Sequence, residues 1–377
     1  MSILFDPAKI KAMALRNRFV RSATYDGYAE KNGHVSEKQR QIYEELARGG
    51  VGLIVTGIAY VHSSGKISPF QNSLASDDCI PGFRKLAAAV HNWGASIAVQ
   101  LFHGGREVAK VYGPERKQAV APSLVNDDPY FQAPYRSMTE DEIWEVVQGF
   151  GDAARRAREA GLDAVQLHGA HAYLVSQFLS PFTNRRADQW GGNLENRLRF
   201  HHEIYRNIRA NVGEDYPVLI KIGVQDGFPG GLEFHEGKQA AQHLAQWGFD
   251  ALEISSGLRG MGYENSEFRS NIKGLEQEAY FRHWCKEIKR EVHVPVMMVG
   301  GLRTFELMEE VIRNQEADFV SLSRPFIKEP GIVNAWKKDD RHRATCISCN
   351  KCFEALLKGE TLHCVYQKEI EGLPLPL

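Results

Sequence analysis

The chain has 377 residues, of which 46 are lysine or arginine and 47 are aspartate or glutamate, so its formal net charge is −1. With 43% hydrophobic and 25% charged residues, the composition excludes a disordered or fibrous protein. The balanced charge argues against nucleic acid as a partner, and no apolar run reaches the roughly 18 residues of a membrane span. The first residues lack the apolar core of a secretory signal, so we expect a cytoplasmic protein.

Eight short runs rich in valine, isoleucine and leucine recur along the chain, each followed by a polar or glycine-rich turn. Runs this short and continuous are typical of parallel strands that are buried on both faces. The predicted strands are residues 19–22, 52–55, 96–101, 164–167, 218–222, 251–254, 295–299 and 318–321.

Amphipathic stretches of helical period lie between these runs. Residues 139–160 begin with Thr139 and Glu142, which have the spacing of a capping box, and end before Gly161. Similar stretches lie at 195–212, 233–248 and 304–315. Eight strand–helix units predict a (β/α)₈ TIM barrel. A doubly wound dinucleotide-binding sheet is disfavoured, because residues 22–27 after the first strand do not supply G-x-G-x-x-G.

We expect one barrel domain over residues 1–340 and a short cysteine-rich C-terminal extension over residues 341–377. Two connections, 102–138 and 255–278, are long for a plain barrel. Long loops at the C-terminal end of a barrel are usually functional, so we expect both to shape the site.

The densest chemistry follows the fourth predicted strand, where His168, His171 and Tyr173 stand within six positions. Two imidazoles and a phenol offer hydrogen-bond donors to an anionic oxygen and a proton source beside it. Either histidine alone has a structural explanation, but the three together at a strand end favour a functional site. A zinc site at the histidines is less favoured, because no carboxylate in this loop completes it.

The run from His168 to Arg197, HGAHAYLVSQFLSPFTNRRADQWGGNLENR, resembles the signature of the Old Yellow Enzyme family, and the resemblance extends from Asn17 to Pro325. It implies FMN at the C-terminal mouth of the barrel, NAD(P)H as the reductant and an electron-poor alkene as the hydride acceptor. By the same resemblance, His168 and His171 bind the substrate oxygen, and Tyr173 protonates the α-carbon.

The resemblance also implies a set of flavin contacts. Gln100 would bind the pyrimidine edge of the flavin, and Lys221 stands where relatives mostly have arginine, beside flavin N1 and O2. Tyr25 stands where other members carry Cys, Thr or His, next to flavin and substrate. The other implied contacts are Ser22, Ala23, Thr24 and Gly57 at the ring, and Gly300, Gly301, Ser323 and Arg324 at the phosphate.

Four cysteines, Cys346, Cys349, Cys352 and Cys364, form the pattern C-x2-C-x2-C-x11-C. A zinc site, a 4Fe-4S cluster and free thiols all remain open from the pattern. It resembles the cluster motif in the branch of the family that includes 2,4-dienoyl-CoA reductase and trimethylamine dehydrogenase. In that branch the cluster exchanges single electrons with FMN and is followed by further nucleotide-binding domains. Because this sequence stops thirteen residues after Cys364, we expect a cluster here either to need an external electron carrier or to be vestigial.

Three functions compete. The leading hypothesis is an FMN-dependent, homo-oligomeric reductase that uses NAD(P)H to reduce small-molecule enones, enals, nitroalkenes or unsaturated thioesters. The second is an amine dehydrogenase or demethylase that passes electrons to an external carrier, but the histidine pair favours an oxyanion over an amine cation. The third is a lyase or isomerase barrel for sugar phosphates. It is disfavoured because Lys221, the only strand-end lysine, has no obvious activating partner in the sequence.

Overall fold

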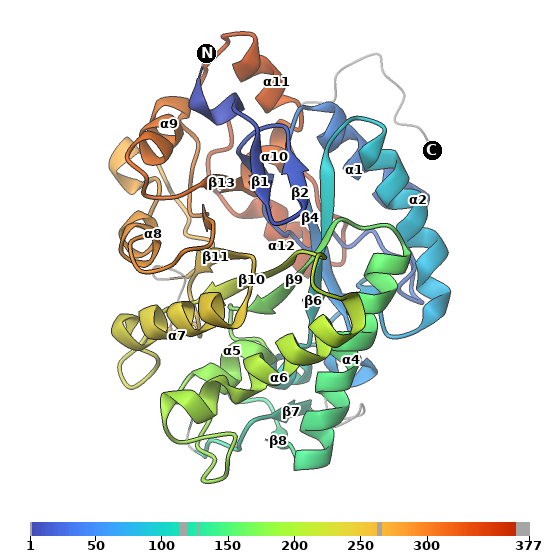
Figure 1. The fold of residues 1–377 in the computed structure, drawn as a ribbon, viewed down its shortest axis with the longest axis vertical. Coiled ribbons are helices and arrows are strands. Elements are labelled where there is room, and N and C mark those ends of the chain that lie inside the picture. The colour runs from blue at the N-terminus through green and yellow to red at the C-terminus, as the bar shows by residue number, and fades with distance from the viewer. Residues whose placement is uncertain (1, 113–118, 127, 262–265, 367–377) are drawn as a thin grey trace.

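The computed structural model describes residues 2–112, 119–126, 128–261 and 266–366. Eight parallel strands form a barrel (Figure 1), which is closed because the first strand pairs with both the last and the second. Each strand coincides with one predicted run, so the barrel prediction is confirmed. The strands are β3 (Phe19–Arg21), β4 (Leu53–Tyr60), β6 (Ser96–Phe102), β9 (Ala164–Gly169), β10 (Val218–Gly223), β11 (Ala251–Ser255), β12 (Val296–Met298) and β13 (Phe319–Leu322).

Helices surround the barrel. They are α1 (Glu37–Arg48), α2 (Ile80–His91), α4 (Glu140–Glu159), α6 (Leu194–Val212), α7 (Phe234–Trp247), α8 (Arg282–Lys289), α9 (Phe305–Arg313), α10 (Arg324–Lys328) and α11 (Ile332–Lys337). The predicted capping box starts α4: the Glu142 amide donates to Thr139 Oγ1 at 3.3 Å, and the Thr139 amide donates to Glu142 Oε2 at 2.9 Å.

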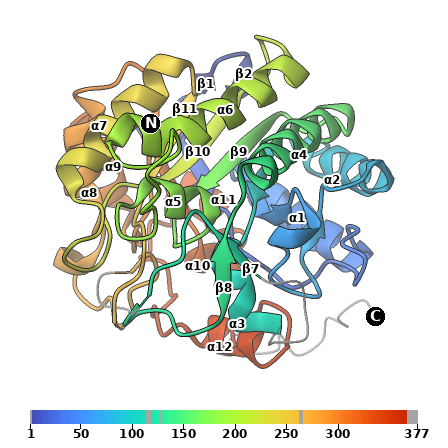
Figure 2. The same ribbon diagram turned by 90° about the horizontal axis from the view of Figure 1, so that it is seen from below.

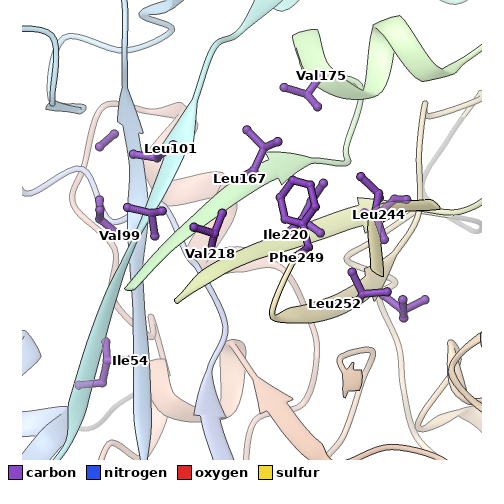
Figure 3. Packing of buried hydrophobic residues seen from close by; sticks show 14 of the residues in the cluster. Ile54, Val99, Leu101, Leu167, Val175, Val218, Ile220, Leu244, Phe249 and Leu252 are labelled. Carbon is purple, nitrogen blue, oxygen red and sulfur yellow. The ribbon is translucent and has the colours of Figure 1, made fainter. Parts of the chain in front are cut away.

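The apolar core has two layers, because successive side chains of a strand point to opposite faces. The outer layer lies between the strands and the helices and includes Val99, Leu101, Leu167, Ile220 and Leu252 (Figure 3). The inner layer lies inside the barrel and is one smaller cluster of side chains, to which all eight strands contribute. Its members include Val20, Leu53, Ala98, Ala164, Leu219, Ala251, Met297 and Phe319.

A short hairpin packs against the inner layer. It consists of β1 (Ala8–Ile10) and β2 (Met13–Leu15), and it contributes the buried side chains Ile10, Met13 and Leu15. The hairpin and helix α12 (Lys351–Leu357) lie at opposite ends of the molecule (Figure 2). The hairpin therefore closes the end of the barrel where the strands begin and leaves the other end for the site.

Both long connections contain short helices or strands. The first contains η4 (Gly105–Glu107), α3 (Val108–Tyr112), and the strand pair β7 (Ala119–Ala121) and β8 (Tyr135–Ser137). The second contains η5 (Leu275–Gln277). The remaining short elements are η1 (Ile3–Phe5), η2 (Ser63–Gly65), β5 (Asn72–Ser73), η3 (Asp77–Cys79) and α5 (Leu174–Leu179). Within the described ranges, no helix is both long and apolar enough to cross a membrane.

Candidate active site

Three neighbouring strands place polar side chains at one level near their C-terminal ends. In the register of the barrel, Lys221 of β10 pairs with His168 of β9 on one side and with Glu253 of β11 on the other. All three are buried, and the Glu253 side chain is fully enclosed. Parallel pairing thus brings together residues that are 53 and 32 positions apart in the chain.

A continuous set of hydrogen bonds crosses the barrel interior at this level. Gln100 Nε2 donates to Gln166 Oε1 at 2.8 Å, and Gln166 Nε2 donates to Glu253 Oε2 at 2.9 Å. Ser22 Oγ donates to the other carboxylate oxygen at 2.7 Å. Lys221 Nζ donates to Ser22 Oγ at 2.8 Å and lies 3.3 Å from Glu253 Oε2. The bonds fix the orientation of the Gln100 amide and the Lys221 ammonium.

Two members of this set, Gln166 and Glu253, were missed in the sequence analysis. Gln166 precedes His168 by two positions, so both side chains point into the barrel. Glu253 lies two positions before Ser255 on a buried strand, so both of these side chains also point into the barrel. A buried glutamate on an apolar strand needs a partner, and Lys221, which had none in the sequence, is that partner.

The predicted catalytic side chains lie side by side. The His168 ring centroid is 4.9 Å from that of His171 and 4.9 Å from that of Tyr173. The Tyr173 ring packs edge-on against Phe102 at 4.5 Å. His171 Nε2 lies 2.7 Å from Ser255 Oγ, which holds the imidazole in place. The structure therefore gathers the two imidazoles and the phenol in one place, as the sequence predicts.

The backbone after β9 is strained. His171 and Ala172 have φ angles of +61° and +66°, in the left-handed region that residues other than glycine seldom adopt. Each such residue costs on the order of 1 kcal/mol and is kept only where the surroundings enforce it. The two consecutive left-handed residues turn the chain sharply and direct His171 toward Ser255.

Burial sets the protonation states of these groups. It lowers the pKa values of His168 and His171 well below the usual range, and the positive charges of Lys221 and Arg259 add to the effect. Both imidazoles are therefore neutral at physiological pH. Burial raises the pKa of Tyr173, and the nearby Arg259 partly offsets this rise. The phenol keeps its proton and can donate it.

The first two strand ends supply small and hydroxyl-bearing residues. Thr24 Oγ1 lies 2.7 Å from Ser323 Oγ, so two predicted flavin contacts from opposite ends of the chain touch each other. A Cβ at Gly57 would lie 2.9 Å from the Thr24 carbonyl oxygen, so no larger residue fits there. Tyr25 packs in the same apolar cluster as Tyr173, next to the predicted catalytic groups.

The predicted phosphate residues form a close-packed turn. Gly300 and Gly301 have φ angles of +127° and +73°, and a Cβ at either would lie about 3 Å from the Tyr280 ring. Arg324 Nη1 donates to the Arg269 carbonyl at 2.8 Å and to Asn350 Oδ1 at 2.5 Å. The Arg324 side chain is thus directed to the C-terminal extension.

These donors fit a flavin mononucleotide. An amide with a donor and an acceptor, a buried ammonium group and several hydroxyls meet at the barrel mouth, and they suit the polar edge and side chain of FMN. The glycine turn after β12 and the short helix after β13 provide the loops where barrels commonly bind phosphate. The same set lacks paired carboxylates, which a sugar-phosphate isomerase would need.

The four cysteines of the C-terminal extension line one small cavity, together with Arg324 and Asn350. All four are unpaired and half-buried. In the described part of the chain, no three histidine, cysteine, aspartate or glutamate side chains are arranged to hold a metal ion. The cysteines thus share one cavity without the arrangement of a metal site, and the metal prediction at Cys346, Cys349, Cys352 and Cys364 stays a prediction.

Comparison with known proteins places the chain among flavin enzymes. The model of the NADH:flavin oxidoreductase / NADH oxidase family matches residues 3–342. An NADH oxidase from Thermoanaerobacter brockii is 38% identical over 92% of this chain, but the chain covers only 52% of that protein. An NADPH dehydrogenase from Geobacillus sp. WCH70 is 34% identical, with 87% of this chain and 92% of that protein covered.

Several solved structures have the same fold as this chain. A 2-naphthoyl-CoA reductase superposes with a TM-score of 0.88 at 28% identity, and the match covers 96% of this chain and 56% of the reductase chain. A histamine dehydrogenase from Rhizobium sp. 4-9 gives 0.83 at 26% identity, covering 96% and 52%. The old yellow enzyme homologue from Zymomonas mobilis gives 0.75 at 25% identity, covering 92% and 95%. The chain thus spans about half the length of several of its relatives.

Proposed function

Because this chain belongs to the NADH:flavin oxidoreductase / NADH oxidase family, we propose that it is an FMN-dependent enzyme that reduces activated C=C bonds with NAD(P)H. The observation that carries the proposal is the grouping of His168, His171 and Tyr173 at the barrel mouth. The His168 ring centroid lies 4.9 Å from that of His171 and 4.9 Å from that of Tyr173. The flavin, when bound, supplies the hydride that it takes from NAD(P)H.

The side chains account for the rest of the reaction. Hydride addition at the β-carbon of an enone moves negative charge onto the carbonyl oxygen. The neutral imidazoles of His168 and His171 donate hydrogen bonds to that oxygen, and they stabilise the enolate more than the ground-state carbonyl. The Tyr173 hydroxyl then gives its proton to the α-carbon. Burial excludes water, which strengthens each of these interactions.

An amine dehydrogenase is the second candidate, because the histamine dehydrogenase fold is similar. The histidine pair opposes it. Burial holds the pKa values of both imidazoles well below the usual range, so they are neutral hydrogen-bond donors and not the anionic groups that would bind an ammonium ion. Neutral donors suit an enolate oxygen.

An iron–sulfur cluster at the four cysteines, with an external electron carrier, is a separate proposal. Its support is the shared cavity that the cysteines line beside Arg324. Iron and acid-labile sulfide in anaerobically purified protein measure the cluster directly, zinc analysis measures the alternative metal, and a thiol assay counts free cysteines. Four reactive thiols without iron or zinc would overturn the metal prediction.

The decisive experiment separates the two half-reactions. The purified holoenzyme should show flavin absorbance bands, lose them when NAD(P)H is added without oxygen, and recover them with cyclohexenone. A protein without flavin bands after FMN reconstitution would contradict the proposal, and so would a reduced flavin that cyclohexenone does not reoxidise.

Tyr173→Phe tests the proton donor. We expect reoxidation by cyclohexenone to slow by roughly 100-fold, the usual contribution of a positioned general acid, while flavin reduction by NAD(P)H stays nearly unchanged. Tyr216→Phe is the control, because the hydroxyl of this half-buried tyrosine donates to the Leu162 carbonyl, at 3.0 Å, away from the predicted catalytic groups. Equal loss of both half-reactions in Tyr173→Phe would exclude the acid role.

A further inference from the structure

A cavity of about 720 Å³ lies at the end of the barrel where the strands end. The loop after β10 forms most of its wall, within residues 225–235, and Arg269 and Trp284 complete it. Its volume is within the usual range of small-molecule sites in proteins. None of the residues predicted to bind flavin or substrate lines this cavity, so it needs an explanation of its own.

The cavity adjoins the candidate active site. Its first wall residue, Gln225, follows the end of β10, the strand that carries Lys221, by two positions. The Val224 amide donates to the Ser255 carbonyl at 3.0 Å, and Ser255 Oγ lies 2.7 Å from His171 Nε2. A long ligand that contacts the histidines can therefore extend its other end into the cavity.

Arg269 supplies the cavity with a cation. Its Nε is buried and has no hydrogen-bond partner among the residues that the structure describes. The guanidinium carbon lies 4.5 Å from the ring centroid of Tyr280 and 5.8 Å from that of Phe281, so stacking holds the side chain in place. Buried polar groups are nearly always hydrogen-bonded, and a guanidinium suits carboxylate or phosphate oxygens. The unpartnered Nε therefore indicates an anionic ligand.

Aromatic rings form the apolar part of the wall. The Trp284 ring stacks with Phe281 and Phe234, at centroid distances of 4.8 and 6.0 Å, and Phe228 stacks with Tyr130 at 4.2 Å. The three rings that line the cavity, Phe228, Phe234 and Trp284, are half-buried, so part of each is left for a ligand. Aromatic side chains stack readily on flat heteroaromatic rings such as nucleobases.

Two carboxylates also line the cavity, and both have other partners. The Asp226 carboxylate accepts hydrogen bonds from Ser180 Oγ at 2.6 Å and from two backbone amides at 2.7 and 2.6 Å. Glu233 is exposed, and its Oε2 lies 3.5 Å from His235 Nδ1. The Arg269 guanidinium is thus the group in the wall that is suited to an anion.

We propose that this cavity binds the adenine-nucleotide end of a reactant, with the purine on the aromatic rings and a phosphate on Arg269. The proposal rests on the function above, because two reactants considered there carry such a group. NAD(P)H carries adenine and phosphates beyond its nicotinamide, and an unsaturated thioester of coenzyme A carries them beyond its acyl chain. The recognised chemistry is the same in both, so the experiment must separate the two sources.

Calorimetric titration of the holoenzyme with AMP tests the cavity without turnover. We expect AMP to bind more tightly than adenosine, which lacks the phosphate. Arg269→Gln should weaken AMP binding about tenfold and leave adenosine binding unchanged, whereas Trp284→Ala should weaken both about tenfold. Arg341→Gln is the matched control, because its guanidinium also stacks on a ring, that of Phe305 at 4.8 Å, but does not line the cavity.

Two results of this titration would overturn the proposal. One is AMP binding that Arg269→Gln leaves unchanged. The other is loss of FMN from Arg269→Gln, which would show that the guanidinium binds the flavin phosphate instead. Circular dichroism verifies that each variant is folded, and Arg269→Lys, which keeps the charge but loses the planar fork, serves if Arg269→Gln is not.

The two half-reactions identify the source of the nucleotide. If it belongs to the reductant, Arg269→Gln should raise the NADPH concentration for half-maximal flavin reduction about tenfold and leave the limiting rate unchanged. If it belongs to the substrate, Arg269→Gln should raise the KM for crotonyl-CoA but not that for S-crotonyl-N-acetylcysteamine, which has the same alkene without the nucleotide. No change in either half-reaction would overturn the proposal.

These readouts also separate the cavity from the proposed function. If the holoenzyme reduces no alkene but Arg269→Gln weakens the binding of both AMP and NADPH, the proposed function fails and the nucleotide site stands. If alkenes are reduced but AMP does not bind, the proposed function stands and the nucleotide site is wrong.

Discussion

The two histidines at the barrel mouth act as neutral groups, and this limits what each can donate. A neutral imidazole has one N–H, so it offers one hydrogen bond and not two. His171 has one ring nitrogen beside Ser255 Oγ, at 2.7 Å, which leaves Nδ1 for a ligand. The Ala170 amide points at His168 Nδ1 over 3.4 Å, so the other nitrogen, Nε2, is the donor available to substrate.

Replacing both histidines by alanine should abolish the charge-transfer complex with phenols, since a phenolate oxygen occupies the place of the enolate oxygen. Each lost donor costs about 3 kcal/mol in such a site. Titration of the long-wavelength absorbance band with a substituted phenol measures the effect. His202→Ala is the control, because that ring stacks on Trp247 at 4.3 Å, between α6 and α7. Unchanged phenol binding in the double variant would show that the imidazoles do not bind the oxygen.

At this scale, sequence reasoning finds the residues that are close together in the chain and misses those that are not. His168, His171 and Tyr173 stand within six positions and could be grouped from the sequence. Glu253 reaches the same level of the barrel only through strand pairing, and Arg259, whose positive charge acts on both imidazoles, comes from the long connection after β11. Neither the strand register nor the path of a loop can be derived from a local sequence pattern, so these partners were not predicted.

Among the elements, those with a local signal were the predictable ones. The capping box of Thr139 and Glu142 places the start of α4 to the residue, and the amphipathic period gives its length. The turn at His171 and Ala172 has no such signal. Two left-handed residues without glycine are held by tertiary contacts, among them the bond from the His171 amide to the Ser256 carbonyl at 3.1 Å.

Thr139→Ala should lower the free energy of unfolding by about 1 kcal/mol, because the Glu142 amide loses its acceptor at the start of α4. Urea denaturation followed by circular dichroism measures the change. Glu233→Ala is the matched control, since Glu233 occupies the same position before α7 but makes no capping bond. A loss in the control as large as that in Thr139→Ala would show that capping is not the cause.

For the whole molecule, the fold was predictable because eight units repeat one pattern. A single ambiguous run is a weak signal, but eight runs at similar spacing fit a closed barrel and few other folds. The hairpin of β1 and β2 was not predicted. Its strands have three residues each, too short for a recognisable alternation, and their function in closing the barrel emerges only from the packed interior.

Acid should destabilise the whole molecule through its buried histidines. Burial lowers the pKa of His201 to about 3, and its ring nitrogens make no hydrogen bond. The unfolded chain takes up a proton below pH 6.5, whereas the folded chain does not until about pH 3. Stability is therefore complete above pH 6.5 and is lost as the pH falls between these values.

His201→Leu should remove one such proton and flatten the pH dependence of the unfolding free energy by about 1.4 kcal/mol per pH unit near pH 5. Urea titrations at several pH values measure how the unfolding free energy depends on pH. At pH 8, the difference in unfolding free energy between the variant and the wild type reports any change in packing alone. An unaltered slope would mean that His201 is protonated in the folded protein as well.

The hydrogen-bonded set inside the barrel restricts how this sequence can diverge. Lys221 and Glu253 neutralise each other where water cannot reach, so the loss of one charge leaves the other without compensation. If a homologue replaces Glu253, Lys221 must be replaced too. Gln166, which donates to the same carboxylate, then needs another acceptor. Paired substitutions at these positions are thus the only inexpensive evolutionary route, and an engineer who redesigns the cofactor pocket faces the same constraint.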